Sequence, residues 1–506
     1  MATSSFTMAF QGVDAHPVEV ECALAPGLPG FTIVGLPNKA VTEARERVRA
    51  SFAALSLALP MERITVNLAP SDLPKEGAHY DLPIALALLA AMGVIPPETL
   101  QDCVALGALS LDGRLISVPG ALPAAVLAAS RGARLLCPEA CGPEAAWVGD
   151  TEVIAAPSLR AMLDHLSGTN PRAPARPGTT CDTPSGPDIA DVRGQERAKR
   201  ALEIAAAGRH HMLMTGPPGC GKSLLAACLP RLLPPLSAQE ALETSMVQSV
   251  AGLLDQGGIS RVRPFRHVHH TASKAALTGG GPNAGPGAIS LAHNGVLFLD
   301  ELPEFAAGVL DTLRQPIEDG VITVARARAH VRYPCRFLLI AAANPCRCGH
   351  MAQPELACPR APQCGADYLG RISGPLLDRF DLRLELSPVS YTDLDLPSGA
   401  DSAQEVARRV LRARDVQALR FADHPNCRSN ADADGPLLTD IAALDDDGRA
   451  LLQRVSERYG LSARGYHRLL RVARTIADLD GAPQVRRSHL AEAVGFRLVQ
   501  PMATAS

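Results

Sequence analysis

The sequence predicts an α/β protein: a parallel sheet flanked by helices, followed by a helical lid and preceded by a second, smaller α/β unit. Three observations predict this class. A glycine-rich octet stands between an apolar run and a helical segment at residues 211–229, the order of a strand, a phosphate loop and a helix. Two further apolar runs, 295–299 and 337–343, end in polar residues, as buried parallel strands do where ligands bind. Residues 167–187, rich in proline and glycine, separate these features from an earlier α/β region.

The chain is long enough for about three domains, since it has 506 residues, of which 47% are hydrophobic. Apolar patterning in the first unit predicts strands over 31–34 and 64–68 and helices over 38–57 and 82–92. The predicted division is an N-terminal α/β domain (1–166), a linker (167–187), the core with the parallel sheet (188–386), a second linker (387–402) and a C-terminal helical lid (403–500).

Composition also limits where the protein works. A net charge of −3 gives no global attraction to nucleic acid, so any such contact must come from a local basic surface. The first ten residues lack the basic and apolar segments of a signal peptide, and the longest apolar stretch, 82–95, is too short to span a bilayer. Thirteen cysteines, an odd number, suggest reduced thiols. We therefore expect a cytoplasmic protein that makes no membrane contact.

The octet fits the pattern G-x-x-x-x-G-K-[S/T], whose backbone N–H groups bind the phosphates of a nucleotide. The helix that follows directs its positive N-terminus at the anion. An ordinary glycine-rich turn would leave the apolar setting of the lysine unexplained. The predicted nucleotide-binding residues are Gly216, Pro217, Pro218, Gly219, Cys220, Gly221, Lys222, Ser223 and Leu224.

The two later strands supply polar groups for the same site. Asp300, after the first, is expected to hold Mg²⁺ beside the hydroxyl of Ser223, and Glu301 is expected to orient and deprotonate the attacking water. The alternative for this acid pair is an ordinary helix cap. Asn344, after the second strand, is expected to contact the γ-phosphate or the water, although an isolated asparagine there is more often a turn residue.

The order of these motifs, followed by Leu-Leu-Asp-Arg-Phe-Asp at 376–381, resembles the AAA+ ATPases of the magnesium-chelatase-like branch. From about residue 6 to residue 498 the chain resembles the ComM/YifB family, the competence-associated members of that branch. The stretches that carry this resemblance are 27–37, 269–273, 291–295 and 462–468.

The resemblance implies further roles. Arg379 would be the arginine finger that reaches the nucleotide of a neighbouring subunit, and Arg464 would be a second sensor on the lid. A guanidinium suits the first role, because it pairs with the γ-phosphate and stabilises transition-state charge; the alternative for Arg379 is a salt bridge with Asp378 or Asp381. Both roles imply a ring, a homohexamer, that hydrolyses ATP with Mg²⁺.

The resemblance also implies a function and an N-terminal fold. The family suggests a DNA motor, a branch-migration helicase in natural transformation or recombination. The competing classes are a chelatase-type motor subunit that remodels a protein partner, and an ATP-dependent protease. Residues 74–83 resemble the region around the catalytic serine of Lon-type proteases, whose domain has the ribosomal S5 domain 2-like fold. His79 occupies the position of the nucleophile, so we expect a catalytically inactive domain.

Three clusters have two interpretations each. The cysteines after Asn344 could hold a structural Zn²⁺ or form a loop of reduced thiols. The basic residues at helical spacing near the C-terminus could form a solvated face or contact phosphate. Three histidines have the spacing of a metal cluster, but we favour a nucleic-acid contact near the pore, together with neighbouring basic residues. In that order, these residues are Cys346, Cys348, Cys358 and Cys364; Arg464, Arg468, Arg471 and Arg474; and His267, His269 and His270 with Arg263, Arg266 and Lys274.

Overall fold

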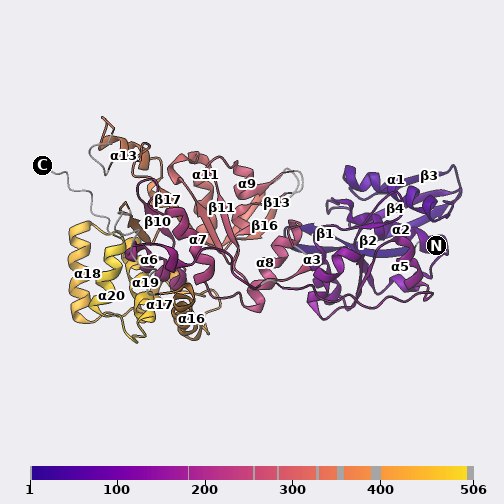
Figure 1. The fold of residues 1–506 in the computed structure, drawn as a ribbon. Coiled ribbons are helices and arrows are strands. Elements are labelled where there is room, and N and C mark those ends of the chain that lie inside the picture. The colour runs from indigo at the N-terminus through magenta and orange to yellow at the C-terminus, as the bar shows by residue number, and fades with distance from the viewer. Residues whose placement is uncertain are drawn as a thin grey trace.

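The computed structural model describes residues 3–180, 182–254, 257–281, 284–325, 330–349, 351, 358–388 and 401–497. The N-terminal part, indigo to purple in Figure 1, lies beside the rest of the molecule, so that the whole is elongated. Within the described ranges no helix has the length and apolar character needed to cross a membrane. Most of the second linker, 389–400, lies outside the described residues.

The N-terminal part is built on a mixed seven-stranded sheet in the order β3-β4-β2-β1-β5-β8-β9. Predicted strands and helices of this part are confirmed as β3, β4, α1 and α2. The hydrophobic helix α2 is buried on all sides from Asp81 to Ala90. Its elements are β1 Thr3–Gln11, β2 Asp14–Ala25, β3 Gly30–Val34, α1 Lys39–Ala54, β4 Arg63–Ala69, α2 Asp81–Ala91, β5 Cys103–Ala105, α3 Ala121–Ser130, β8 Arg134–Pro138, α4 Gly142–Ala145, β9 Val153–Ala156 and α5 Leu159–Leu166.

His79 lies inside this part, just before α2. Its Nε2 is 2.9 Å from the carbonyl oxygen of Met8, and its side chain is buried. Burial lowers the pKa of His79 from 6.5 to about 4, although the hydrogen bond to Met8 raises it. The imidazole is therefore neutral at pH 7 and resists protonation in the folded chain.

We expect the free energy of unfolding of the N-terminal part to fall by about 3 kcal/mol between about pH 6.5 and about pH 4. His79 binds a proton near pH 6.5 in the unfolded chain but only near pH 4 in the folded chain. The contribution of neutral His79 to the free energy of unfolding is therefore complete above this window and lost below it. Urea unfolding followed by the fluorescence of Trp147, the one tryptophan, measures this part of the molecule. The variant His79→Gln, which does not titrate, should lose less stability over the same window; an equal loss would contradict the assignment.

The second part contains the predicted parallel sheet, with helices on both faces (Figure 1). Its five strands are all parallel, in the order β11-β14-β17-β10-β18. The central strands β14 and β17 are wholly buried, which accounts for their continuous apolar sequences. Its main elements are α6 Glu196–Gly208, β10 Met212–Thr215, α7 Lys222–Leu232, α8 Ala238–Val250, β11 Phe265–Val268, α9 Lys274–Thr278, α10 Ala288–Leu291, β14 Val296–Leu299, α11 Ala307–Leu310, α12 Arg314–Asp319, β15 Val321–Ala325, β16 His330–Pro334, β17 Leu338–Ala343, α13 Gln363–Leu369, α14 Gly374–Asp378 and β18 Leu382–Glu385.

The C-terminal helices share one hydrophobic core with the five-stranded sheet, to which α6, α16 and α19 all contribute buried side chains. The apolar side of α19 is buried in this core. The helices are α16 Ala403–Arg420, α17 Gly435–Ile441, α18 Asp446–Tyr459, α19 Ala463–Leu479 and α20 Arg487–Arg497.

Three of the four arginines on the basic side of α19 bond within the protein, so this side is not the continuous solvated face that its spacing suggests. Arg474 is only 1% exposed and forms an ion pair with Asp478 at 2.8 Å. Arg471 Nε donates to the carbonyl oxygen of Ala433 at 2.6 Å. Arg468 also bonds within the protein, as described below. Of the four arginines, only Arg464 is exposed, because the other three satisfy carbonyl or carboxylate groups of neighbouring segments.

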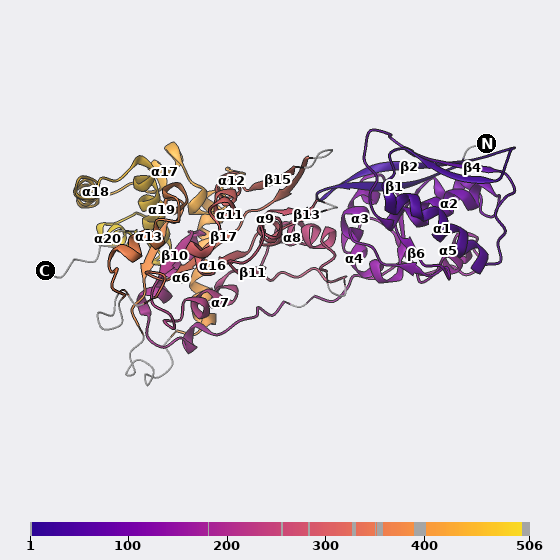
Figure 2. The same ribbon diagram turned by 90° about the horizontal axis from the view of Figure 1, so that it is seen from above.

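The two parts meet where α3 lies beside α8 (Figures 1 and 2). The amide of Gly120 donates to the carbonyl oxygen of Ser249 at 3.1 Å, and Trp147 Nε1 donates to the carbonyl oxygen of Gly257 at 2.8 Å. The β15–β16 hairpin extends toward the N-terminal sheet (Figure 2). The two parts are therefore joined by hydrogen bonds as well as by residues 167–187.

Candidate nucleotide site

The phosphate loop connects β10 to α7 at the carboxyl edge of the sheet. Gly219 and Gly221 have φ angles of 76° and 89°, in the left-handed region that favours glycine. Gly216 is packed too closely for a side chain, since a Cβ there would lie 2.9 Å from Leu386. Helix α7 begins at Lys222, so its first backbone N–H groups have no partner within the helix and are available to an anion.

Lys222 and Asn344 meet at this loop. Lys222 is only 9% exposed, and its Nζ donates to the carbonyl oxygens of Gly216 and Pro217, each at 2.8 Å. The same Nζ lies 3.1 Å from Oδ1 of Asn344, the residue that directly follows β17. A phosphate at the loop would offer the ammonium group charged oxygens, which form stronger hydrogen bonds than neutral carbonyls do.

The acid pair, Asp300 and Glu301, contacts the start of α7 through Ser223. Ser223 Oγ donates to Asp300 Oδ2 at 2.7 Å, and the amide of Glu301 donates to Asp300 Oδ1 at 2.9 Å. The hydroxyl and the carboxylate are the oxygen ligands that Mg²⁺ prefers in proteins. The structure therefore brings together the residues that the sequence assigns to the metal.

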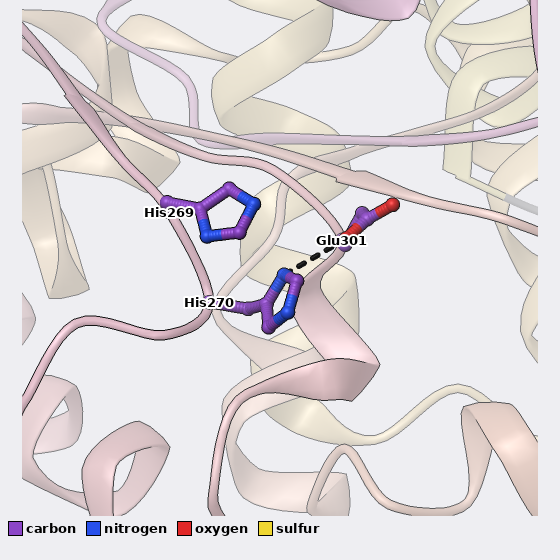
Figure 3. A group of neighbouring side chains, drawn as sticks. All are labelled: His269, His270 and Glu301. Atoms are coloured by element: carbon purple, nitrogen blue, oxygen red, sulfur yellow. Dashed lines mark ion pairs between the residues drawn. The ribbon is translucent and has the colours of Figure 1, made fainter.

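Glu301 has an unusual backbone conformation. Its φ angle is 52°, in the left-handed region, which costs a residue other than glycine on the order of 1–3 kcal/mol. Glu301 precedes the short turn Leu302–Glu304, but its side chain makes no capping hydrogen bond there. Glu301 therefore stands at the N-cap position of this turn, but its carboxylate does not act as the capping group. The carboxylate points to His270, whose Nδ1 lies 2.8 Å from Glu301 Oε2 (Figure 3).

Arg379 lies at the opposite edge of the sheet from the phosphate loop. It follows α14, and the next two amides, of Asp381 and Leu382, donate to the carbonyl oxygen of His211, which precedes β10. The loop follows the other end of β10, so about 15 Å of extended chain separates the two edges. An arginine side chain cannot span that distance. Arg379 therefore cannot contact a nucleotide bound to the phosphate loop of its own protomer.

Arg379 is nearly buried, at 7% exposure. Its Nη1 donates to the carbonyl oxygen of Pro375 at 2.6 Å, and its Nη2 pairs with Glu318. Its Nε has no hydrogen-bond partner among the described residues. Burial lowers the pKa of Arg379; Glu318 raises it, whereas Arg464 and Arg468 lower it. The partner Glu318 was not foreseen from the sequence, which suggested Asp378 or Asp381.

Asp381 instead connects the segment after α14 to α19. His210 Nδ1 lies 3.0 Å from Asp381 Oδ2, and Arg468 Nη1 lies 2.7 Å from Asp381 Oδ1. Arg468 also donates to the carbonyl oxygen of Arg379 at 2.8 Å. Burial would raise the pKa of Asp381, but the hydrogen bond to His210 and the charge of Arg468 hold it well below its usual value.

A cavity of about 560 Å³ lies at this edge of the sheet. Arg464 lines it together with Arg379, so the two arginines lie on the same side of the protomer. Its lining combines six arginines with six carboxylates, and four of the arginines form ion pairs with carboxylates of the same lining. The arginines in its lining are Arg209, Arg336, Arg379, Arg464, Arg468 and Arg471.

Comparison with known proteins agrees with this geometry. Three family models match the chain: magnesium chelatase subunit ChlI over residues 188–394, subunit ChlI of Mg-chelatase over 20–141, and the C-terminal part of subunit ChlI over 400–497. Protein YifB of Escherichia coli is 43% identical over 97% of this chain and 96% of its own length. Competence protein ComM of Haemophilus influenzae is 42% identical over the same shares. The chain belongs to the magnesium-chelatase-like ComM/YifB family.

A more distant relative is the magnesium-chelatase 38 kDa subunit of Rhodobacter capsulatus, 27% identical over 59% of this chain and 83% of that subunit. The magnesium-chelatase models belong to the AAA+ type of motor, which agrees with the parallel sheet and its phosphate loop. Membership of the ComM/YifB family thus confirms the resemblance that the motifs indicate.

The cysteines of this ComM/YifB-family chain follow Asn344. Cys346 Sγ lies 3.1 Å from Cys348 Sγ, and a hydrogen bond with Cys358 raises the pKa of Cys364 to about 11. In the part of the chain that is described, the four thiols do not form a group whose ligand atoms all lie within 4.8 Å of one another. The nearby His350 lies outside the described residues. Cys364 also has a hydrogen bond with Cys346, so the thiols lie near one another, but the family matches do not support zinc, which stays a prediction.

The predicted nucleic-acid contacts of this family member are corrected in part. Arg263 pairs with Glu240 at 2.9 Å and donates to the carbonyl oxygen of Asn294 at 2.7 Å, so it is used inside the protein. Arg266 is half-buried, and burial lowers its pKa. Lys274 is exposed. Of these three residues, only Lys274 offers an unobstructed charge.

Proposed function

We propose that this chain is the subunit of a ring-shaped, ATP-hydrolysing motor whose active sites are shared between neighbours. Lys222 and the loop amides would bind the phosphates, Asn344 would contact the γ-phosphate or the attacking water, and Glu301 would accept the proton of that water. Mg²⁺, held by Ser223 and Asp300, would neutralise charge on the phosphate oxygens. The observation that carries the proposal is the separation of the loop from Arg379, which lie at opposite edges of one sheet.

The neighbouring subunit would complete the site. Arg379 cannot reach its own phosphate loop, and its Nε is buried with no partner among the described residues. Heterologous contacts between subunits close into rings when the rotation permits. In such a ring this cavity would face the next nucleotide, so Arg464 would act in trans beside Arg379. We propose a homohexamer, as the family resemblance implies.

The proposed substrate is branched DNA, and the proposed role is branch migration in natural transformation or recombination. The support is the 42% identity to a competence protein along nearly the whole chain.

We further propose the division into domains given above, with residues 1–166 as an inactive, Lon-protease-like domain that serves binding or assembly. Lys75 of that domain is buried and donates to the carbonyl oxygen of Pro70.

We expect ATP hydrolysis to rise several-fold with four-way or forked DNA, and the purified protein to convert a synthetic four-way junction into products only with ATP. Gel electrophoresis of labelled junctions and phosphate release measure the two activities. The variant Lys222→Ala is the control, because it lacks the ammonium group at the phosphate loop and should do neither. Junction conversion by that variant would contradict the motor.

A chelatase-type motor that remodels a protein partner is the second candidate. The observation in its favour is the 27% identity to a magnesium-chelatase subunit. It predicts ATP hydrolysis that no DNA stimulates and co-purification with a large protein partner. DNA stimulation in the assay above therefore separates the two candidates.

A further inference from the structure

Two histidines face the proposed catalytic base. Strands β11 and β14 are parallel neighbours, with Val268 paired to Leu299, so the residues that follow them leave the sheet at the same edge. These residues are His269 and His270 after β11, and Asp300 and Glu301 after β14. Figure 3 shows both imidazoles beside the carboxylate of Glu301.

The three side chains form a compact set of metal ligands. One nitrogen of His269, one nitrogen of His270 and one carboxylate oxygen of Glu301 all lie within 4.8 Å of one another. Among the described residues, this is the one group of three or more His, Cys, Asp or Glu side chains that meets this distance. His267, although it is close in sequence, does not belong to it, since its ring packs 4.9 Å from that of Phe298.

The contact between His270 and Glu301 leaves a nitrogen unsatisfied. Nδ1 of His270 lies 2.8 Å from Glu301 Oε2, but the two groups are not aligned as a hydrogen bond requires. This Nδ1 is inaccessible to water and has no hydrogen-bond partner within the described ranges. A buried polar atom without a partner is costly, so a ligand between the imidazole and the carboxylate would stabilise the arrangement.

We propose that His269, His270 and Glu301 form a binding site for a divalent transition-metal ion such as Zn²⁺. Two imidazoles and one carboxylate are typical ligands of such ions, whereas Mg²⁺ prefers oxygen ligands alone. Metal bonds of about 2.0–2.1 Å in a tetrahedral arrangement hold ligand atoms roughly 3.3 Å apart, so small side-chain rotations suffice. His269 Nδ1 lies 3.0 Å from Thr271 Oγ1, a contact that orients its ring.

Such an ion inhibits ATP hydrolysis, because a carboxylate that binds a metal cannot accept a proton from water. This consequence rests on the proposed function, in which Glu301 is the base. Binding of the ion does not rest on it. The two statements can therefore be tested apart from each other.

The cysteines after Asn344 are the alternative zinc ligands that the sequence suggests, and the experiment must separate the two sites. The full-length protein is stripped with a chelator, dialysed and titrated with ZnCl₂ in a calorimeter. We expect His269→Ala to bind one zinc ion fewer than the parent, or to bind it at least about tenfold more weakly. The double variant Cys346→Ser/Cys348→Ser is expected to keep that ion.

Cobalt gives an independent measurement, since Co²⁺ bound to imidazole and carboxylate lacks the thiolate charge-transfer absorption that cysteine ligands produce. His269 is exposed, so His269→Ala should fold, and circular dichroism checks this. The site is disproved if the parent binds no zinc, if His269→Ala keeps the full stoichiometry and affinity, or if only the cysteine variant loses the ion.

ATP hydrolysis with and without ZnCl₂ is then measured for each protein against its own metal-free rate. We expect zinc to suppress the parent at least tenfold and His269→Ala much less. Zinc binding that depends on His269 but does not change the rate would uphold the site and contradict Glu301 as the base. If no zinc binding depends on His269, the metal site is disproved, and the role of Glu301 as the base is unaffected.

Discussion

Glutamine in place of Glu301 is expected to leave ATP binding intact and to slow hydrolysis by about 10²–10⁴-fold, the usual contribution of general base catalysis. An amide of the same size and shape occupies the position after Asp300, but it cannot accept the proton of the attacking water. The groups that bind the phosphates are untouched, since Lys222 and Ser223 make their hydrogen bonds to other partners. Equilibrium binding of labelled ATP and steady-state release of phosphate measure the two effects separately.

Glu304 provides the matched control for this substitution. It ends the short turn Leu302–Glu304, which Glu301 precedes, and it pairs at 3.5 Å with Arg371 rather than with the phosphate-loop residues. Glu304→Gln should hydrolyse ATP at close to the parental rate. Glu301→Gln that still turns over ATP at the parental rate would show that another group accepts the proton. Loss of ATP binding would assign Glu301 a structural role instead.

Local sequence was sufficient for the loop and for the acid pair. A phosphate loop is specified by consecutive glycines and a lysine, and the strands β14 and β17 carry uninterrupted apolar residues because both of their faces are buried. Parallel strands then bring Lys222, Asp300 and Asn344 to one edge, whatever the loops between them do. These positions follow from the chain's short-range order.

The errors come from contacts between distant segments. Helical spacing grouped Arg474 with Arg464, but Arg474 is buried and donates to the carbonyl oxygens of Ala482 and Pro483, which follow α19. The proximity of Arg464 to Arg379 depends on Arg468, which ties α19 to the segment after α14. His270 reaches Glu301 because β11 pairs with β14, and no local pattern states which strands are neighbours. Sequence order alone could not supply these three facts.

The separation of Arg379 from its own phosphate loop leads to the most demanding test of the shared site. Arg379→Ala is expected to assemble normally and to lose about 10³-fold or more in hydrolysis rate, the effect of removing an arginine finger. Sedimentation verifies the assembly. Lys222→Ala is expected to be equally inactive for a different reason, because its phosphate loop lacks the ammonium group.

Mixing these two inactive proteins should restore activity. Where an Arg379→Ala protomer supplies the phosphate loop and a Lys222→Ala neighbour supplies the arginine, the interface contains both the lysine and the arginine. Random 1:1 mixing makes about one quarter of the interfaces complete in this sense. Arg379→Ala mixed with the double variant Lys222→Ala/Arg379→Ala is the control, since no interface then contains an arginine finger. If every protomer carried a complete site, both mixtures would stay inactive. Recovery in the first mixture alone requires that one subunit binds the phosphates and the next contributes the arginine, because no single chain in that mixture has both.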